Sequence, residues 1–300
     1  MLKSFTDIYQ AVQQLDHVRT ISVAMADDES VLSALRDAEA QNICHAMLVG
    51  DPQKIRTVAG QVDYPLREDR IVAADNDVEI AQRAVDLVRS GAAEILMKGH
   101  ISTPILMKAV LDRETGLRKG DVLSHVAVAE IPTYPKLFLL SDGGINILPD
   151  LEKKEAILQN ILSVSRQLGI DHPKVAALGP IEKVNPKIPE TVDAAELQKN
   201  AQAGKYGNIL LEGPIAMDVA LSAEAAQRKG ITSQIAGDAD IFLVPDITCG
   251  NVAIKVLMRL ANAKVGGVVV GAKVPIILLS RSDKPEEKLN SISLSILLGD

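Results

Sequence analysis

The chain has 300 residues, of which 47% are apolar, so it can bury a large core, and its length favours two domains over one. It carries a net charge of −7, contains no tryptophan and is only 2% aromatic. It therefore lacks the basic face and the stacking platforms of nucleic-acid binders, and we expect no nucleic-acid partner.

No apolar run is long enough to cross a bilayer, and Met1–Leu15 is amphipathic rather than a basic patch followed by an apolar one. We therefore expect a cytoplasmic protein without a membrane partner. The two cysteines, Cys44 and Cys249, have no metal-type spacing, so neither a disulfide nor a metal site is expected. Cys44 is interpreted as core packing. Cys249 could border a pocket, although a small buried side chain that packs in the core is the favoured interpretation.

Short β-branched runs alternate with amphipathic helical stretches along the first half of the chain, which is typical of a parallel sheet with crossover helices. The predicted strands are 20–24, 46–49, 70–73 and 95–97. The predicted helices are 7–15, 29–40, with Asp28 as its N-cap, 78–90 and 104–111.

A second α/β unit is predicted beyond residue 124. Its strands are predicted at 126–131, 137–140, 175–178, 208–211, 241–244 and 267–270. Its helices are predicted at 151–168, 192–199, 223–229 and 251–260. The proline-rich stretch 179–191 suits neither element, and a functional loop or an ordered surface loop fits it equally well.

The segment Lys98–Thr103, KGHIST, follows a predicted strand and precedes a predicted helix. Lys98 offers a positive charge, Gly99 allows a ligand to approach the backbone, and Ser102 or Thr103 can cap the helix and hydrogen-bond an oxygen. The pattern suggests a cradle for phosphate or carboxylate. An N-cap ahead of a proline explains the two hydroxyls equally well, and His100 is more often structural than catalytic.

Two further polar segments follow predicted strands. DGGIN, Asp142–Asn146, is either a ligand-binding loop or a plain turn. Gly237–Asn251 contains three aspartates, Asp238, Asp240 and Asp246, for which turn and capping roles are favoured over a metal site.

The segment Lys273–Asn290 carries the strongest signal for a site. Residues 274–279 are predicted as a buried strand that delivers Ser280 and Arg281 to a turn before a helix near Pro285, where an anion can bind backbone N–H groups and a guanidinium. Asp283 and Glu286 have the spacing of a capping box, which leaves Glu287 for chemistry.

Several of these segments together resemble the phosphate acetyl/butyryltransferase family, and the butyryl branch more than the acetyl branch. The matching segments run from about Ala24 to Asn290 and are MKGHISTP, LSHVAV, DGGINILPDLEKK, EKVNPKIPETVDA, GDADIFLVPDI, CGN and VGAKVPIILLSRSD. The resemblance implies an isocitrate dehydrogenase-like fold, with two three-layer α/β/α domains, mainly parallel sheets and an active-site cleft between the domains. The domains are expected at 1–128 with 270–300, and at 129–269.

The resemblance also implies an enzyme that interconverts acyl-CoA plus orthophosphate with acyl phosphate plus CoA. Coenzyme A is then a substrate, no tightly bound cofactor is expected, and symmetric self-association is the common case. The implied catalytic residues are Ser280, Arg281 and Glu287, the last being aspartate in the acetyl branch. The candidate substrate-binding residues are Lys98, His100, Ser102, Thr103, Lys108, Asn146, Asn251 and Asn290. Lys108 stands where the acetyl branch has an arginine, and a further arginine of that branch has no counterpart near 118–125.

The expected chemistry is shared among these side chains. Arg281, with Lys98 or Lys108, neutralises the departing phosphate, Ser280 hydrogen-bonds the developing oxyanion, and Glu287 steers or accepts the thiol proton. Phosphate acetyltransferase is an alternative within the family. Two competing hypotheses are a relative of the NAD-dependent β-decarboxylating dehydrogenases and a CoA-binding module without turnover.

Overall fold

The computed structural model describes residues 1–279 and 283–299 and divides the chain into two compact units. Unit A comprises Phe5–Asp121 and Lys264 to the C-terminus, and unit B comprises Met1–Ser4 and Val122–Ala263. These boundaries fall a few residues before the expected 128/129 and 269/270. The shift arises because β5 (Ser124–Glu130) pairs with β6 (Phe138–Ser141) in unit B, and β10 (Lys264–Val270) pairs with β11 (Ile276–Ile277) in unit A.

Unit A contains a mainly parallel sheet in the order β3-β2-β1-β4-β11-β10, in which only the β10–β11 pair is antiparallel. Its remaining strands are β1 (Arg19–Ala24), β2 (Cys44–Gly50), β3 (Ile71–Ala73) and β4 (Ile95–Lys98). The strand β1 lies between β2 and β4, and its last four residues are all buried, as expected for a strand covered on both faces.

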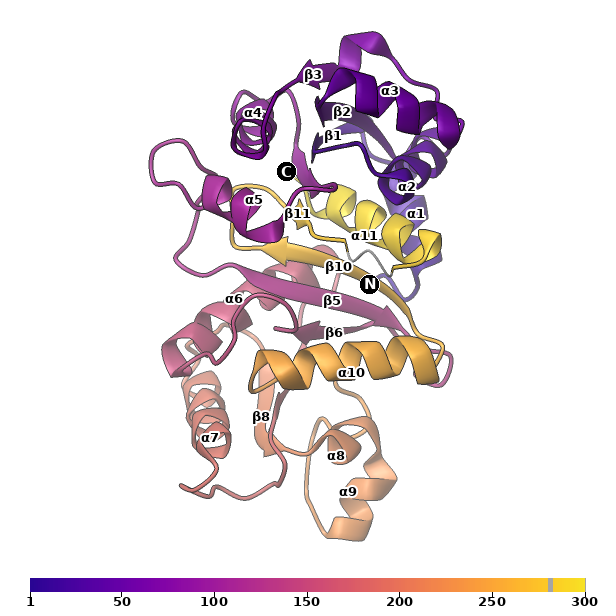
Figure 1. Cartoon of the computed structure of the whole chain (residues 1–300). Helices are drawn as coiled ribbons and strands as arrows, with labels where there is room; N and C mark the ends of the chain where they lie inside the picture. The colour runs from indigo at the N-terminus through magenta and orange to yellow at the C-terminus, as the bar shows by residue number, and fades with distance from the viewer. Residues whose placement is uncertain (280–282, 300) are drawn as a thin grey trace. The chain divides into compact units, whose positions relative to one another are not determined.

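Helices cover both faces of the unit A sheet (Figure 1), with α4 and α5 on one side and α1, α2, α3 and α11 on the other. Their bounds are α1 (Phe5–Gln13), α2 (Glu29–Ala40), α3 (Pro52–Gln61), α4 (Asp77–Arg89), α5 (Thr103–Val110) and α11 (Pro285–Leu298), with a short 3₁₀ helix at Glu68–Arg70. Asp28 caps α2 as predicted, because its carboxylate accepts the Val31 N–H at 3.0 Å.

Unit B has a sheet in the order β5-β6-β9-β7-β8, parallel except for the β5–β6 hairpin. The other strands are β7 (Lys174–Leu178), β8 (Leu210–Ile215) and β9 (Ile241–Leu243). Helices α6 (Leu151–Gln167) and α7 (Pro189–Gln202) pack on one face and α10 (Ile247–Leu260) on the other (Figure 1), while α8 (Met217–Leu221) and α9 (Ala223–Lys229) pack on each other. The predicted α/β class with mainly parallel sheets is thus confirmed.

The structure has two helices that were not predicted, and one predicted strand is much shorter than expected. Helix α3 was not predicted, although Asp51 and Pro52 form a standard helix start, and α8 was also missed. The strand predicted at 274–279 is reduced to Ile276–Ile277, because Pro275 has no N–H to donate to the ladder and the chain leaves the sheet after two residues.

Candidate functional site

Lys98–Thr103 begins at the carboxyl end of β4 in unit A, beside the end of β1. This is where the strand order reverses, the usual place for a ligand in an open α/β sheet. The Gly99 N–H donates to Ala24 O at 2.8 Å, and the His100 N–H donates to Met25 O at 2.8 Å. A Cβ on Gly99 would lie 2.1 Å from Met25 O. The sequence suggested that Gly99 lets a ligand approach the backbone. In the structure, the backbone of Gly99 is instead in close contact with the loop after β1.

The two hydroxyls of this segment lie at the start of α5. Ser102 occupies the N-cap position but makes no capping hydrogen bond, and both Ser102 and Thr103 are exposed. Capping therefore does not explain these hydroxyls, and they remain available to a ligand at the first turn of a helix. Lys108 is exposed in the last turn of the same helix, and the half-buried Lys98 donates to Gly99 O at 3.1 Å.

A cavity of about 430 Å³ opens at the carboxyl edge of the unit A sheet, and His100 is one of its lining residues. Four aspartates and one lysine share the lining: Asp27, Asp51, Asp75, Asp77 and Lys54. The excess of carboxylates repels phosphate, so this cavity does not suit the anionic end of an acyl phosphate.

The segment after β11 holds the predicted catalytic residues. Ser280 and Arg281 lie outside the described residues. Glu287 is the third residue of α11, and its carboxylate accepts the Lys284 N–H at 2.7 Å. The predicted capping box of Asp283 and Glu286 is therefore wrong by one residue, because α11 begins at Pro285 and places Glu287 at the capping position.

Asn290 is fully buried within unit A. Its side-chain oxygen accepts a hydrogen bond from the Tyr9 hydroxyl, and its amide donates to Val265 O at 3.4 Å. These bonds join α1, α11 and β10, so the described contacts of Asn290 are those of a core residue rather than of a surface ligand site.

The DGGIN segment forms a closed turn after β6 in unit B, organised by Asp142, which is only 3% exposed. The Asp142 carboxylate accepts four hydrogen bonds, from the N–H groups of Gly144, Ile145 and Asn146 and from the Asn146 side-chain amide. That amide also donates to Leu123 O at 2.8 Å. The amide hydrogens of Asn146 therefore hold the turn together.

Asn251 reaches the same turn from the first half of α10. Its side-chain amide donates to Gly143 O at 3.2 Å, and the residue is exposed. The predicted capping role of Asp246 is confirmed, since its carboxylate accepts the Cys249 N–H at 2.8 Å. Cys249 is half-buried, and burial raises the pKa of its thiol. The structure thus brings Asn146 and Asn251 together around Gly143.

His125 on β5 is a third polar side chain at this turn, and the sequence analysis did not select it. A Cβ on Gly144 would lie 3.2 Å from the Cγ of the His125 ring, so ring and turn are in close contact. Burial lowers the pKa of His125, and the negative charge of Asp142 partly opposes that shift. A signal was available, because His125 belongs to LSHVAV, one of the segments that carry the family resemblance.

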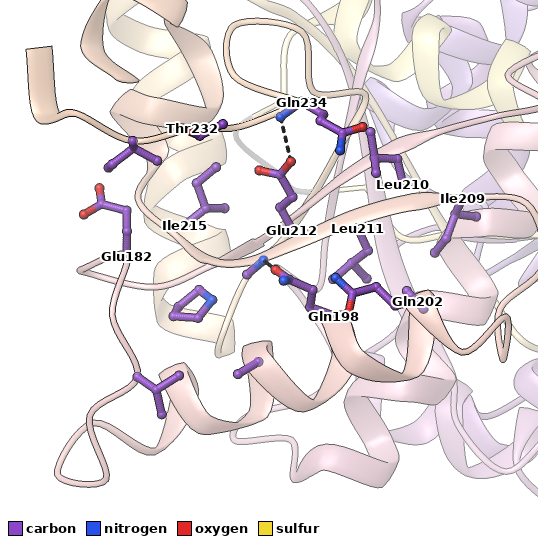
Figure 2. A pocket seen from close by; sticks show the side chains of 16 residues that line it. Glu182, Gln198, Gln202, Ile209, Leu210, Leu211, Glu212, Ile215, Thr232 and Gln234 are labelled. Carbon is purple, nitrogen blue, oxygen red and sulfur yellow. Dashed lines mark hydrogen bonds between the residues drawn. The ribbon is translucent and has the colours of Figure 1, made fainter. Parts of the chain in front are cut away.

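A second cavity, of about 710 Å³, lies in unit B along the edge strand β8 (Figure 2). Gln198 from α7 accepts the Gly213 N–H at 2.8 Å, and Glu212 accepts the Gln234 N–H at 2.7 Å. These bonds occupy polar groups of the strand and of the neighbouring loop. None of the candidate site residues that the structure describes lines this cavity.

Known proteins are similar to this chain in sequence and in fold. The family model described as "Phosphate acetyl/butaryl transferase" matches residues 70–296. The phosphate butyryltransferase of Clostridium acetobutylicum is 42% identical over 99% of this chain and 99% of its own length. The phosphate acetyltransferase of Thermotoga maritima is 39% identical over 92% of this chain and 94% of its own length.

A branched-chain phosphotransacylase from Enterococcus faecalis V583 superposes with a TM-score of 0.82 at 35% identity, covering 94% of this chain and 99% of its own. A 4-hydroxythreonine-4-phosphate dehydrogenase from Burkholderia phymatum has a TM-score of 0.56 at 15% identity, a likeness of fold alone.

The fold and the nearly full-length matches define an acyltransferase. The chain belongs to the phosphate acetyl/butyryl transferase family. Among the helices of residues 1–279 and 283–299, none is long and apolar enough to cross a membrane.

Proposed function

We propose that this protein is a phosphate acyltransferase that interconverts acyl-CoA plus orthophosphate with acyl phosphate plus CoA, and that butyryl is its preferred acyl group. The observation that carries the proposal is the 42% identity to a phosphate butyryltransferase over essentially the full length of both chains. The described structure adds exposed hydroxyls and a lysine around the start and end of α5, a suitable setting for an anionic substrate.

The preference for a butyryl group is the second part of the proposal. Relatives named for butyryl and for acetyl transfer differ by only a few percent in identity to this chain, and the E. faecalis protein is named for branched-chain substrates. An apolar pocket discriminates a single methylene by about 1–3 kcal/mol, so neighbouring chain lengths should react at graded rates. Phosphate acetyltransferase is the second candidate.

The proposed roles of the side chains follow from the negative charges on the substrates and on the groups that form during the reaction. Arg281 binds and neutralises the phosphate group through two hydrogen bonds, assisted by Lys98 or Lys108, and Ser280 hydrogen-bonds the oxyanion that forms on the acyl carbon. Ser102 and Thr103 bind phosphate oxygens at the start of α5. Because an acyl phosphate is already activated, alignment of the two anionic substrates supplies much of the acceleration.

Glu287 is poorly suited to removing the thiol proton alone. A glutamate at its reference pKa of about 4.3 lies roughly 4 units below a thiol at about 8.5, an uphill transfer of about 6 kcal/mol. Its carboxylate also accepts the Lys284 N–H, so part of the group is engaged in the cap of α11. We therefore assign Glu287 to orienting the CoA thiol.

The direct test incubates the purified protein with orthophosphate and acetyl-, propionyl-, butyryl-, isobutyryl- or valeryl-CoA and measures thiol release with a disulfide reagent. We expect phosphate-dependent release that is fastest with a four-carbon acyl group. Fastest release with acetyl-CoA would favour a phosphate acetyltransferase. If no thioester releases its thiol, the remaining hypothesis is a CoA-binding module without turnover. Reduction of NAD by a hydroxy acid would favour the dehydrogenase alternative.

The cellular setting belongs to the same proposal. We infer a cytoplasmic, homo-oligomeric enzyme that uses CoA as a substrate and requires no tightly bound cofactor. Dialysis against a chelator should therefore leave activity unchanged, and light scattering should give a mass that is a multiple of 32.1 kDa.

A further inference from the structure

Helix α10 is unusually apolar for a helix on the surface of unit B. Most of its 14 residues are apolar, yet Gly250 is the one residue of this fully described helix that is buried. Its main contact among the described helices and strands is β6. A helix that is apolar around most of its circumference is normally buried. The contacts within unit B therefore leave part of its apolar surface uncovered.

The inner side of α10 is defined by its contact with the turn after β6. A Cβ on Gly143 would lie 2.7 Å from Ile254 Cδ1 and 3.1 Å from the carbonyl carbon of Gly250, so these two residues face the turn. Successive residues of an α-helix are about 100° apart. Val252 and Val256 follow Gly250 and Ile254 by two positions, which places them on the opposite, outward side of the helix.

Three aliphatic residues form a row along that outward side, which we call the outer row. Val252, Val256 and Leu260 are 55%, 46% and 80% exposed. Their spacing of four residues makes them a ridge of the kind that packs into the groove of another helix. In Figure 1, α10 runs across the front of unit B, and no drawn element of that unit lies in front of it. The outer row is therefore open to a partner.

Two further exposed aliphatic residues lie at the N-terminal end of α10. The Ile247 N–H donates to Ile147 O at 3.2 Å, and Ile147 and Leu148 are 77% and 79% exposed. We call these two residues and the outer row together the outer face. Monomeric proteins rarely expose a contiguous apolar patch larger than a few hundred Å², and such a patch usually marks an interaction site.

We propose that the outer face binds the same face of a second copy of this chain, with the two α10 helices antiparallel across a two-fold axis. The inference rests on the homo-oligomeric enzyme proposed above and adds the surface through which it assembles. An axis near the middle of α10 places Val252 of one copy against Val256 of the other, and Leu260 against the Ile147–Leu148 segment. The two ends of the face, which are its most exposed parts, thus cover each other.

The charges around the outer face fit this arrangement. Asp246 caps the first turn of α10, whereas Lys255 and Arg259 lie in its last two turns. An antiparallel pair brings the basic end of each helix beside the acidic end of the other, and it also opposes the two helix dipoles favourably. Helices that lie on membranes instead have a polar face rich in lysine and arginine, and this chain has a net charge of −7. A second copy therefore fits the face better than a lipid surface does.

The test measures the mass of the assembly by analytical ultracentrifugation at micromolar concentration. We expect wild type to sediment at twice 32.1 kDa or at a larger even multiple. Val256→Glu places two carboxylates near the axis and should raise the dissociation constant of this interface by about 30-fold or more. The matched control is Val192→Glu on α7, because Val192 is 42% exposed, and this variant should sediment as wild type does.

A monomeric wild type, or a Val256→Glu protein with the wild-type mass, would overturn the proposal. So would binding of wild type to anionic lipid vesicles that Val256→Glu abolishes, since that result assigns the face to a membrane. Both substitutions are at positions with exposed side chains, and thermal melting checks that the variants fold. Thiol release from acyl-CoA is measured on the same samples, so failure of the proposed activity is recorded separately from failure of the interface.

Cross-linking locates the contact by a second route. Val256→Cys in a Cys249→Ser background, treated with a short bismaleimide, should give a covalent dimer on a denaturing gel, whereas Val192→Cys in the same background should not. Cys44 is buried and should not react. Equal cross-linking of the two variants, or no covalent dimer of Val256→Cys, would contradict the antiparallel pairing of α10.

Discussion

At the scale of single residues, the proposed chemistry depends most on Arg281, because a planar guanidinium can grip phosphate through two parallel hydrogen bonds. Replacing Arg281 by Gln should lower turnover by about 10²- to 10³-fold and raise the KM for phosphate, and Arg281→Lys should recover only part of the loss. Steady-state kinetics in both directions check this. The control is Arg228→Gln, which removes an exposed ion pair with Glu224 and should leave kinetics unchanged. Unaltered kinetics in Arg281→Gln would remove this residue from the site.

His125 also predicts how stability depends on pH. Its pKa is lowered in the fold, so the unfolded chain binds a proton more readily, and the stabilisation from the neutral ring is lost as the pH falls below about 6.5. Urea unfolding at pH 7.5 and pH 5.5 should show a decrease in the free energy of unfolding on acidification, and the decrease should be smaller in His125→Gln. An equal decrease in both proteins would contradict the lowered pKa.

At the scale of elements, the start of α11 combines a structural and a proposed catalytic role in Glu287. Glutamine can accept the Lys284 N–H as glutamate does, so Glu287→Gln should keep the helix cap, whereas Glu287→Ala should lose it. We expect Glu287→Gln to melt with wild type and to lose up to about tenfold in turnover, and Glu287→Ala to lose both stability and activity. Wild-type turnover across the alkaline range in Glu287→Gln would end its assignment to the thiol.

The contact between the loops after β1 and β4 gives a second prediction at this scale. Gly99→Ala places a methyl group 2.1 Å from Met25 O and should cost roughly 1–3 kcal/mol, as overpacking does. Gly60→Ala, in unit A helix α3 with open space around it, should instead stabilise by about 0.5–1 kcal/mol. Thermal and urea unfolding check both variants, and a Gly99→Ala protein as stable as wild type would show that the two loops separate easily.

Helices and strands were predicted well from the sequence where the local capping residues and the apolar pattern agree with the tertiary environment. Helix α2 begins and ends at the predicted residues because Asp28 is a strong N-cap ahead of a regular apolar stripe. The capping box of α11 was misplaced by one residue, since three-residue spacing occurs at both Asp283–Glu286 and Lys284–Glu287 and only the true helix start decides between them. The close contact between Gly99 and Met25 could not be predicted, because the two residues are brought together by the pairing of β1 with β4.

At the scale of the whole molecule, the sequence revealed the class of the fold and the family, but not which polar residues are used inside the protein. Asn146 and Asn290 were both selected as substrate-binding residues on sequence grounds. In the structure, the first closes a turn around Asp142 and the second is a buried link between helices and a strand. An asparagine amide serves a ligand and a backbone carbonyl equally well, so residue type alone could not separate these roles.

The central claim is that an acyl group passes from CoA to orthophosphate. The most direct measurement follows butyryl-CoA and phosphate by ³¹P nuclear magnetic resonance with purified protein. We predict a new acyl phosphate resonance that grows in step with released CoA and reverses when excess CoA is added. Release of CoA without an acyl phosphate signal, or at a rate independent of phosphate, would contradict the claim and identify a hydrolase instead.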